Sequence, residues 1–289
     1  MVKKTIEKLL QDGINIIKKG EYNNPCLDVQ LVLSYLLNKD KIYMFLHKNE
    51  EVEDDIAKKY YEMIEKRNSG YPLQYMINSQ EFMGLDFFVQ EGVLVPRPDT
   101  ETLVEKIINY VNNSDIKNKN IKILDIGTGS GAIGVSLAYY LKNSEVTAID
   151  ISDIAIETSN INVKKMNVQN INIIKEDIFK GTEIINNKYD IVVSNPPYIE
   201  SDVISNLQTE VSKYEPKSAL DGGIDGLEHY RQIVDIFKDI HCSNAMLSVE
   251  IGYNQKQSVT KIFEKANIFN KIECDKDLSG NFRVVSGFL

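Results

Sequence analysis

The sequence has 289 residues, of which 43% are hydrophobic, so that one large or two modest domains have ample apolar material for a core. The formal charge of −9 at pH 7 disfavours a surface that grips duplex nucleic acid, and we expect no stable nucleic-acid partner. The three scattered cysteines have no C-x-x-C spacing, which argues against structural zinc and favours a reducing compartment, and we expect no metal site.

The amino-terminal residues follow an amphipathic helical pattern, which differs from the continuous apolar run of a signal peptide. No apolar stretch reaches the length that crosses a membrane. We therefore expect a cytoplasmic protein without a membrane partner.

Four helices are predicted before Gly70, because apolar residues recur at helical spacing between residues 4 and 69. Asn24-Pro25 starts the second helix, and Asp40 caps a short third one. These helices form a small bundle, which we assign to a first domain of residues 1–72.

From Pro72 onwards the pattern changes to a period of two, which predicts strands at 75–77 and 81–89 that turn near Gly84. We assign residues 73–94 to a β-hairpin linker. Next, Val95-Pro-Arg-Pro-Asp-Thr-Glu101 precedes a helix that Asp99 or Thr100 could cap. Four of the seven prolines lie in this segment and in 195–198, which suggests two rigid lips of one cleft, although the segment could also be a plain proline-rich helix start.

A glycine loop, residues 127–131, follows the predicted strand 121–126 and precedes a helix. Nineteen residues after Gly131, a second strand ends at Asp150, which is well placed to accept hydrogen bonds from ribose hydroxyls. The loop fits the relaxed dinucleotide fingerprint, so alone it does not separate a nicotinamide cofactor from S-adenosylmethionine. Asp125, just before the loop, would repel a pyrophosphate but suits the cationic amine of a methionine moiety. We therefore favour a methyl donor.

Asp177 and Ile178 follow a third predicted strand, residues 171–174. A carboxylate there can accept a hydrogen bond from an exocyclic amine, and Ile178 can lie against a purine ring. The alternative is an exposed loop acid, since surface acids are common.

A short apolar strand ends at Asn195-Pro196-Pro197-Tyr198. The two prolines fix φ and leave nearby carbonyls without local partners. Such a carbonyl and the Asn195 side-chain oxygen can accept both hydrogens of a planar –NH2 group, while Tyr198 offers a flat face for stacking. The tetrad therefore predicts a clamp for an amide or arylamine nitrogen, with a plain turn as the alternative.

For the rest of the chain, the sequence predicts a glycine-rich loop at 215–226, further strands and helices, and a terminal antiparallel hairpin.

These motifs resemble class I S-adenosylmethionine-dependent methyltransferases that act on amide or amine nitrogen. The 95–101 segment, the stretch Ala219-Leu-Asp-Gly-Gly-Ile-Asp-Gly226 and the helical domain resemble the peptide chain release factor glutamine methyltransferases. The resemblance implies an α/β fold in which residues 95–289 form a seven-stranded, mostly parallel Rossmann-like sheet with an antiparallel edge. It implies methylation of the glutamine in the Gly-Gly-Gln motif of release factors, which supports translation termination, and S-adenosyl-L-methionine as cofactor.

The resemblance also assigns the site residues. The cofactor residues are Asp125, Gly127, Thr128, Gly129, Ser130, Gly131, Asp150, Asp177, Ile178 and Asn195. The catalytic residues, which also bind substrate together with Arg97, are Asn195, Pro196, Pro197 and Tyr198. Position 178, often a larger aromatic in the family, is Ile here.

Three alternatives stay open. An adenine-specific DNA or RNA methyltransferase would present the same exocyclic –NH2 to the tetrad, although the net acidity counts against it. Ribosomal-protein glutamine methyltransferases share the tetrad but differ after Val-Pro-Arg, and a non-catalytic module could retain the fold.

A glutamine clamp offers little surface for selecting one protein, so we expect residues 1–72 to dock the protein substrate.

Overall fold

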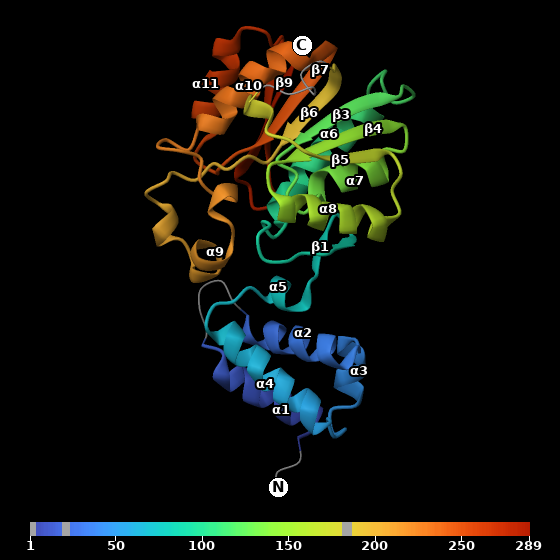
Figure 1. The fold of residues 1–289 in the computed structure, drawn as a ribbon, viewed down its shortest axis with the longest axis vertical. Coiled ribbons are helices and arrows are strands. Elements are labelled where there is room, and N and C mark those ends of the chain that lie inside the picture. Colours follow the sequence, from blue (N-terminus) through green and yellow to red (C-terminus); the bar gives the residue numbers. More distant parts are fainter. Residues whose placement is uncertain (1–3, 19–23, 181–186) are drawn as a thin grey trace. The chain divides into compact units, whose positions relative to one another are not determined.

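The computed structural model describes residues 4–18, 24–180 and 187–289. The chain divides into two compact units (Figure 1). The first unit, Met1–Asn78, also includes the later segment Gln208–Tyr214. The second unit consists of Ser79–Leu207 and Glu215–Leu289.

The first unit is helical. Its elements are α1 (Ile6–Ile16), α2 (Pro25–Leu37), α3 (Lys41–Leu46), α4 (Asp54–Asn68), α5 (Leu73–Ile77) and the later helix α9 (Thr209–Tyr214). The side chains of Thr5, Asn24 and Asp40 each accept a hydrogen bond from a backbone N–H in the first turn of α1, α2 and α3. The four helices predicted before Gly70 are thus confirmed.

The strand predicted at 75–77 is wrong, because these residues belong to helix α5. Leu73 and Ile77 are four residues apart and both pack against the core of the helical unit, which is the spacing of one helix face. A run of three apolar residues is compatible with the period of a strand and with that of a helix. Here the helix forms because it packs its apolar side chains against the bundle.

A buried arginine holds α9 in the first unit. The Nε atom of Arg67 on α4 donates to Asp28 Oδ2 on α2 at 2.7 Å, and its Nη1 donates to Glu210 on α9. Arg67 and Asp28 are both about 6% exposed. Burial raises the pKa of Asp28, although the arginine opposes that shift. The three charges bring together residues that are 143 positions apart in sequence.

The second unit is built on a seven-stranded sheet of order β5-β4-β3-β6-β7-β9-β8 (Figure 1). Its strands are β3 (Ile121–Ile126), β4 (Ser144–Asp150), β5 (Ile171–Lys175), β6 (Tyr189–Ser194), β7 (His241–Glu250), β8 (Lys271–Lys276) and β9 (Phe282–Phe288). Among the strands that the structure describes in this sheet, β9 pairs antiparallel with β7 and with β8, and the other neighbouring strands pair parallel. The predicted mostly parallel methyltransferase sheet with an antiparallel end is therefore confirmed.

Helices cover both faces of the sheet. Consecutive residues of a strand point to opposite faces, so neighbouring residues of the central strands pack in different cores. Ile123 and Val193 pack in one core with α6 (Glu101–Asn112) and α7 (Ala132–Tyr140), against which α8 (Asp153–Met166) also packs. Leu124 and Val192 pack in the other core with α10 (Glu228–Ile240) and α11 (Lys256–Ala266). Both faces of the central strands are buried, which explains their continuous apolar sequence.

A small hairpin precedes the sheet in the second unit. Its strands β1 (Gln80–Phe82) and β2 (Leu85–Phe87) pair antiparallel, and Met83 and Gly84 in the turn have φ of 53° and 67°. The predicted turn near Gly84 is confirmed. None of the described helices is long and apolar enough to span a membrane.

Candidate functional site

A cavity of about 240 Å³ lies in the second unit at the carboxyl ends of the central strands. The strand order reverses between β3 and β6, and α/β sheets bind ligands at such a switch point. Among the predicted site residues, those in the cavity wall are Gly127, Gly129, Asp150, Asp177, Asn195, Pro196 and Pro197.

The glycine loop presents bare backbone to this cavity. Gly127 and Gly129 have φ of +72° and +56°, and a Cβ atom at either position would meet no heavy atom within 4 Å. Asp150 at the end of β4 fixes the loop, because its Oδ2 accepts from Gly129 N at 2.9 Å and its Oδ1 accepts from Ser152 N at 2.9 Å. Each carboxylate oxygen retains a lone pair for a ligand hydroxyl.

Asp125 lies behind the glycine loop and not in the cavity wall. Its side chain is fully buried, and Oδ2 accepts from Thr128 Oγ1 at 2.6 Å and from Gly134 N at 2.9 Å. Its Oδ1 is buried and finds no hydrogen-bond partner within the described chain. Burial raises the pKa of Asp125 to about 7, and the two hydrogen bonds oppose that shift.

The raised pKa predicts that Asp125 makes the second unit less stable as pH rises. Between the ordinary value of 3.8 and about 7, the folded protein holds a proton that the unfolded chain releases. Asp125→Asn removes this titration, so the free energy of unfolding of the variant should not fall with pH for this reason. The difference in free energy of unfolding, variant minus wild type, should therefore increase across that pH range by on the order of a few kcal/mol, since one pKa unit corresponds to about 1.4 kcal/mol. Urea unfolding of both proteins at several pH values measures this difference. A difference that stays constant with pH contradicts the assignment.

Thr128, Ser130 and Gly131 also lie outside the cavity wall. Thr128 holds the Asp125 carboxylate, and the backbone oxygen of Ser130 accepts from Asn162 Nδ2 at 2.8 Å. Gly131 caps the start of α7 with φ of +84°, a conformation that favours glycine. These residues shape the loop that the cavity exposes.

Asp177, after β5, also lines the cavity. A hydrogen bond from Lys180 lowers the pKa of this carboxyl group, so that it is ionised. The side chain of Ile178 lies outside the described residues. Phe179 and His229, which the sequence interpretation missed, also line the cavity, and their ring centroids are 5.8 Å apart. The sequence did offer a signal for Phe179, because an aromatic residue directly after Ile178 could have been assigned to the adenine contact.

Asn195 follows β6 and is held through its amide nitrogen. Its Nδ2 donates to Thr100 Oγ1 at 3.3 Å, and within the described chain no hydrogen bond to its Oδ1 is recorded. The two proline-rich segments therefore touch through this pair. The predicted cap of α6 is wrong, because Thr100 makes no capping hydrogen bond and Asp99 pairs with Arg283 at 2.9 Å.

Tyr198 and Arg97 do not line the cavity. The Tyr198 hydroxyl donates to Glu250 Oε1 at 3.3 Å, and burial raises the pKa of this phenol. Arg97 Nη2 contacts both carboxylate oxygens of Glu215 at 2.7 Å. Glu250, at the end of β7, is a further residue that the sequence interpretation missed.

The glycine-rich loop after residue 215 packs on the backbone of the tetrad. Ile199 N donates to Leu220 O at 3.0 Å, and Gly222 N donates to Ile199 O at 2.8 Å. A Cβ atom at Gly222 would lie 2.7 Å from Tyr198 Cα and 2.9 Å from Pro197 O, closer than real contacts allow. Gly222 therefore permits the close approach of the two segments.

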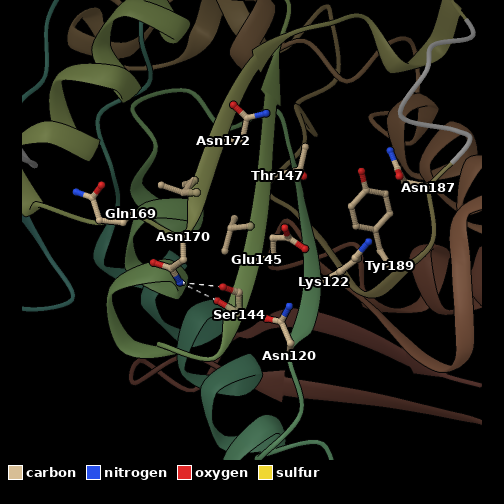
Figure 2. A pocket seen from close by; sticks show the side chains of 12 residues that line it. Asn120, Lys122, Ser144, Glu145, Thr147, Gln169, Asn170, Asn172, Asn187 and Tyr189 are labelled. Atoms are coloured by element: carbon tan, nitrogen blue, oxygen red, sulfur yellow. Dashed lines mark hydrogen bonds between the residues drawn. The ribbon is translucent and has the colours of Figure 1, made fainter.

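A second hollow lies at the amino ends of β3, β4, β5 and β6 (Figure 2). It is lined by polar side chains such as Asn170, whose Nδ2 donates to Ser144 O at 3.1 Å and to Ser144 Oγ at 3.3 Å. None of the predicted site residues lines it. Among the residues that the structure describes, no acidic, cysteine or histidine side chains gather in a group that could hold a metal ion.

Two family descriptions match the chain. Residues 8–77 match the PrmC N-terminal domain, and residues 101–213 match the methyltransferase small domain. Among solved structures, a methyltransferase from Pyrococcus furiosus is similar with a TM-score of 0.50 and 19% identity, covering 71% of this chain and 89% of that one. At that identity the similarity shows the fold alone.

Curated relatives are similar over almost their entire length. The release factor glutamine methyltransferase of Clostridium botulinum is 39% identical over 284 residues, which cover 97% of this chain and 98% of the relative. The enzyme of the same name from Clostridium acetobutylicum is 42% identical over 281 residues, with 97% of each chain covered. The chain therefore belongs to the release factor glutamine methyltransferase family.

Proposed function

We propose that this enzyme transfers the methyl group of S-adenosylmethionine to the side-chain amide nitrogen of a glutamine in peptide chain release factors, and so supports translation termination. Besides the family membership, one structural observation supports the proposal. The Asn195 amide nitrogen donates to Thr100, which leaves the side-chain oxygen as an acceptor, and Asn195 lines the same cavity as Gly127 and Gly129 of the glycine loop. The sequence resemblance to release factor glutamine methyltransferases implies that the substrate glutamine belongs to a Gly-Gly-Gln motif.

The residues in the cavity fit S-adenosylmethionine. Asp150 has lone pairs for two ribose hydroxyls, Asp177 is an ionised acceptor for an exocyclic amine, and the bare backbone of Gly127 and Gly129 leaves room for the ligand. Phe179 and His229 offer ring faces for a purine. When bound, the cofactor supplies an electrophilic methyl group on a sulfonium.

We expect Asp150→Ala to lower cofactor affinity by at least about tenfold, since charge-assisted hydrogen bonds contribute roughly 1.5–3 kcal/mol each. The substitution also removes the acceptor that holds Gly129 N. Calorimetric titration with S-adenosylmethionine measures the loss. Asp153→Ala is the matched control, because it removes an exposed carboxylate three residues away that pairs with Lys175. Equal affinity of folded Asp150→Ala and wild type would refute the ribose assignment.

The protein must make a poor nucleophile react, because the lone pair of an amide nitrogen is delocalised into its carbonyl. The Asn195 oxygen and the Pro196 carbonyl can each accept one hydrogen of the substrate –NH2 and so aim its nitrogen at the methyl group. No hydrogen bond to the Pro196 carbonyl is recorded in the described chain, so it is available. Both acceptors also stabilise the positive charge that develops on nitrogen. The proton is then lost to the Asn195 oxygen or to solvent.

Incubation with radiolabelled S-adenosylmethionine tests the function directly. We expect label in a release factor, and none in the same release factor with the glutamine of its Gly-Gly-Gln loop replaced by alanine. Parallel reactions with a ribosomal protein and with DNA and RNA oligonucleotides test the alternatives. Label that enters only an oligonucleotide or only the ribosomal protein would overturn the proposal.

We also propose that the helical unit docks the release factor, because a clamp for one side chain offers little area for choosing among proteins. Its helix α3 presents Ile42, Phe45 and Leu46, which are 69–79% exposed. An exposed apolar cluster of this kind suits contact with a protein surface.

A further inference from the structure

The side chain of Gln255 joins the end of the tetrad to two other segments of the second unit. Its Nε2 donates to the carbonyl oxygen of Tyr198 at 2.9 Å and to that of Gly226 at 3.1 Å. Its Oε1 accepts from Gly252 N at 3.0 Å. Gln255 is 8% exposed. One buried amide group therefore links the tetrad, the glycine-rich loop and the segment that follows β7.

The surroundings of Gln255 determine the orientation of its amide. Two of its neighbours are carbonyl oxygens, which only accept, and the third is the N–H of Gly252, which only donates. A reversed amide would place its oxygen against both carbonyls and its nitrogen against the N–H. The observed orientation is the one that pairs all three groups.

The helix that Gln255 precedes does not use this side chain. Gln255 occupies the position before α11, where Ser, Thr, Asn or Asp often accepts from a free N–H of the first turn. Its side chain makes no such capping hydrogen bond and instead reaches Tyr198, 57 residues earlier in the chain. A Cβ atom at Gly226 would lie 2.8 Å from Gln255 Nε2 and 2.5 Å from Tyr198 O, so glycine permits this approach.

The peptide group between Tyr198 and Ile199 is held at both of its polar atoms. Gln255 donates to its oxygen, and its N–H donates to Leu220 O at 3.0 Å. Because a peptide group is planar, two such bonds fix its orientation as well as its position. The end of the tetrad is thus attached to the glycine-rich loop and, through Gln255, to the start of α11.

The prolines extend this restraint to the acceptors of the clamp. Their rings fix φ at Pro196 and Pro197, so few torsions remain free between Asn195 and Tyr198. The start of the tetrad is held by β6, which ends at Ser194. A shift of the Tyr198 carbonyl would therefore also move the Pro196 carbonyl and the Asn195 side chain, which belong to residues of the cavity wall.

We propose that Gln255 is a positioning residue for methyl transfer, which holds the tetrad so that its two acceptors face the substrate nitrogen. The inference rests on the proposed function, because it concerns the same clamp. Gln255 does not line the cavity, so it acts through Tyr198. Loss of the Nε2 donor would release the Tyr198 carbonyl and with it the end of the tetrad.

Gln255→Met and Gln255→Glu test this role. Methionine keeps the length of the side chain but has no donor, while an ionised glutamate still accepts from Gly252 N and places its second oxygen against two carbonyls. We expect kcat to fall about tenfold in Gln255→Met, because small displacements of reacting groups are costly. Gln255→Glu should be at least as slow at about pH 8.5, where a glutamate of ordinary pKa is ionised. The KM for release factor and the affinity for S-adenosylmethionine should change by less than about twofold.

Ser286→Ala is the control for stability. Ser286 and Ser248 form a buried hydroxyl pair between β9 and β7, with their oxygen atoms 2.8 Å apart. Removal of one hydroxyl takes this partner from the other and should lower the melting temperature, as loss of the Gln255 hydrogen bonds also should. We expect the kcat of Ser286→Ala to stay within about twofold of wild type, which separates the loss of positioning from the loss of stability.

Hydrogen exchange supplies a readout that needs no substrate. The N–H of Ile199 is protected by its bond to Leu220 O. In Gln255→Met this amide should exchange faster than in the wild type and in Ser286→Ala, because its peptide group has lost one of two hydrogen bonds. NMR spectra of the individual amides measure the rates.

Three results would overturn the inference: wild-type kcat in folded Gln255→Met or Gln255→Glu, an equal fall of kcat in Ser286→Ala, or unchanged exchange of Ile199 in Gln255→Met. Failure of the proposed function gives a different result, because the wild-type protein itself would leave the release factor unlabelled. In that case the variants are compared on whichever substrate the wild type labels, and the exchange of Ile199 is measured in the same way.

Discussion

Replacing Asn195 by alanine should lower the rate of methyl transfer to a release factor by at least about tenfold, the rate equivalent of 1.4 kcal/mol. The substitution removes the acceptor and leaves one substrate N–H unpaired in the cavity, at a cost of roughly 1–3 kcal/mol. The cost rises further as positive charge develops on the nitrogen. Single-turnover transfer measures the rate, and calorimetry with S-adenosylmethionine measures binding. Cofactor affinity should fall less than the rate, although Asn195 lines the same cavity.

Asn195→Asp is the companion variant. It keeps an acceptor in the cavity wall but adds a charge that must be desolvated, and Thr100 then loses the N–H that it accepts in the wild type. We expect it to be impaired as well, and the loss of rate should vary with pH as the added carboxyl group titrates. Near wild-type transfer by folded Asn195→Ala would reduce the tetrad to a turn and remove the proposed clamp.

Gly222→Ala should impair methyl transfer as strongly, although Gly222 does not line the cavity. The added Cβ would lie 2.7 Å from Tyr198 Cα and 2.9 Å from Pro197 O, and both contacts are with backbone that cannot rotate away. The segments must separate, which moves the tetrad relative to the cavity. A displacement of about 1 Å can cost on the order of a hundredfold in rate. Single-turnover transfer at saturating cofactor measures the effect.

Gly280→Ala is the control for this prediction. Gly280 lies in the turn between β8 and β9 with φ of +85°, and its added Cβ would meet no atom within 4 Å. This substitution therefore strains the backbone without approaching the site. We expect it to lower the melting temperature while the rate stays within about twofold of wild type. Full activity of Gly222→Ala would show that the tetrad does not depend on the loop that packs against it.

The sequence predicted the parts of the site that are local in the chain. The glycine loop and the Asn195 tetrad each follow a strand and Asp150 ends one, so the order of the elements alone brings them to one edge of a parallel sheet. The contacts that hold them were not predictable in this way. Thr100 is 95 residues from Asn195, and Glu250 is 52 residues from Tyr198. Thr100 matches the pattern of a helix cap, and no local pattern reveals that its hydroxyl serves Asn195.

The orientation of the Asp125 side chain was also not predictable from the sequence. Its position before the glycines predicts an acid near the ligand, but whether that carboxylate faces the ligand or the loop depends on side-chain packing. In the structure, Thr128 and Gly134 occupy its Oδ2. Short apolar runs were similarly ambiguous, since residues 75–77 fit a strand or a helix until their packing partners were known.

The assignment of α9 to the helical unit changes what an exchange of parts between relatives would involve. The chain leaves the first unit after Asn78, returns to it at Gln208 and leaves again after Tyr214. The returning segment also lies between Tyr198 and Gly222 in sequence, the two positions that meet beside the clamp. A chimaera with a relative's helical unit therefore requires two grafts, residues 1–78 and 208–214. A transplant of the first segment alone would place the native Glu210 opposite an arginine that the donor protein has to supply.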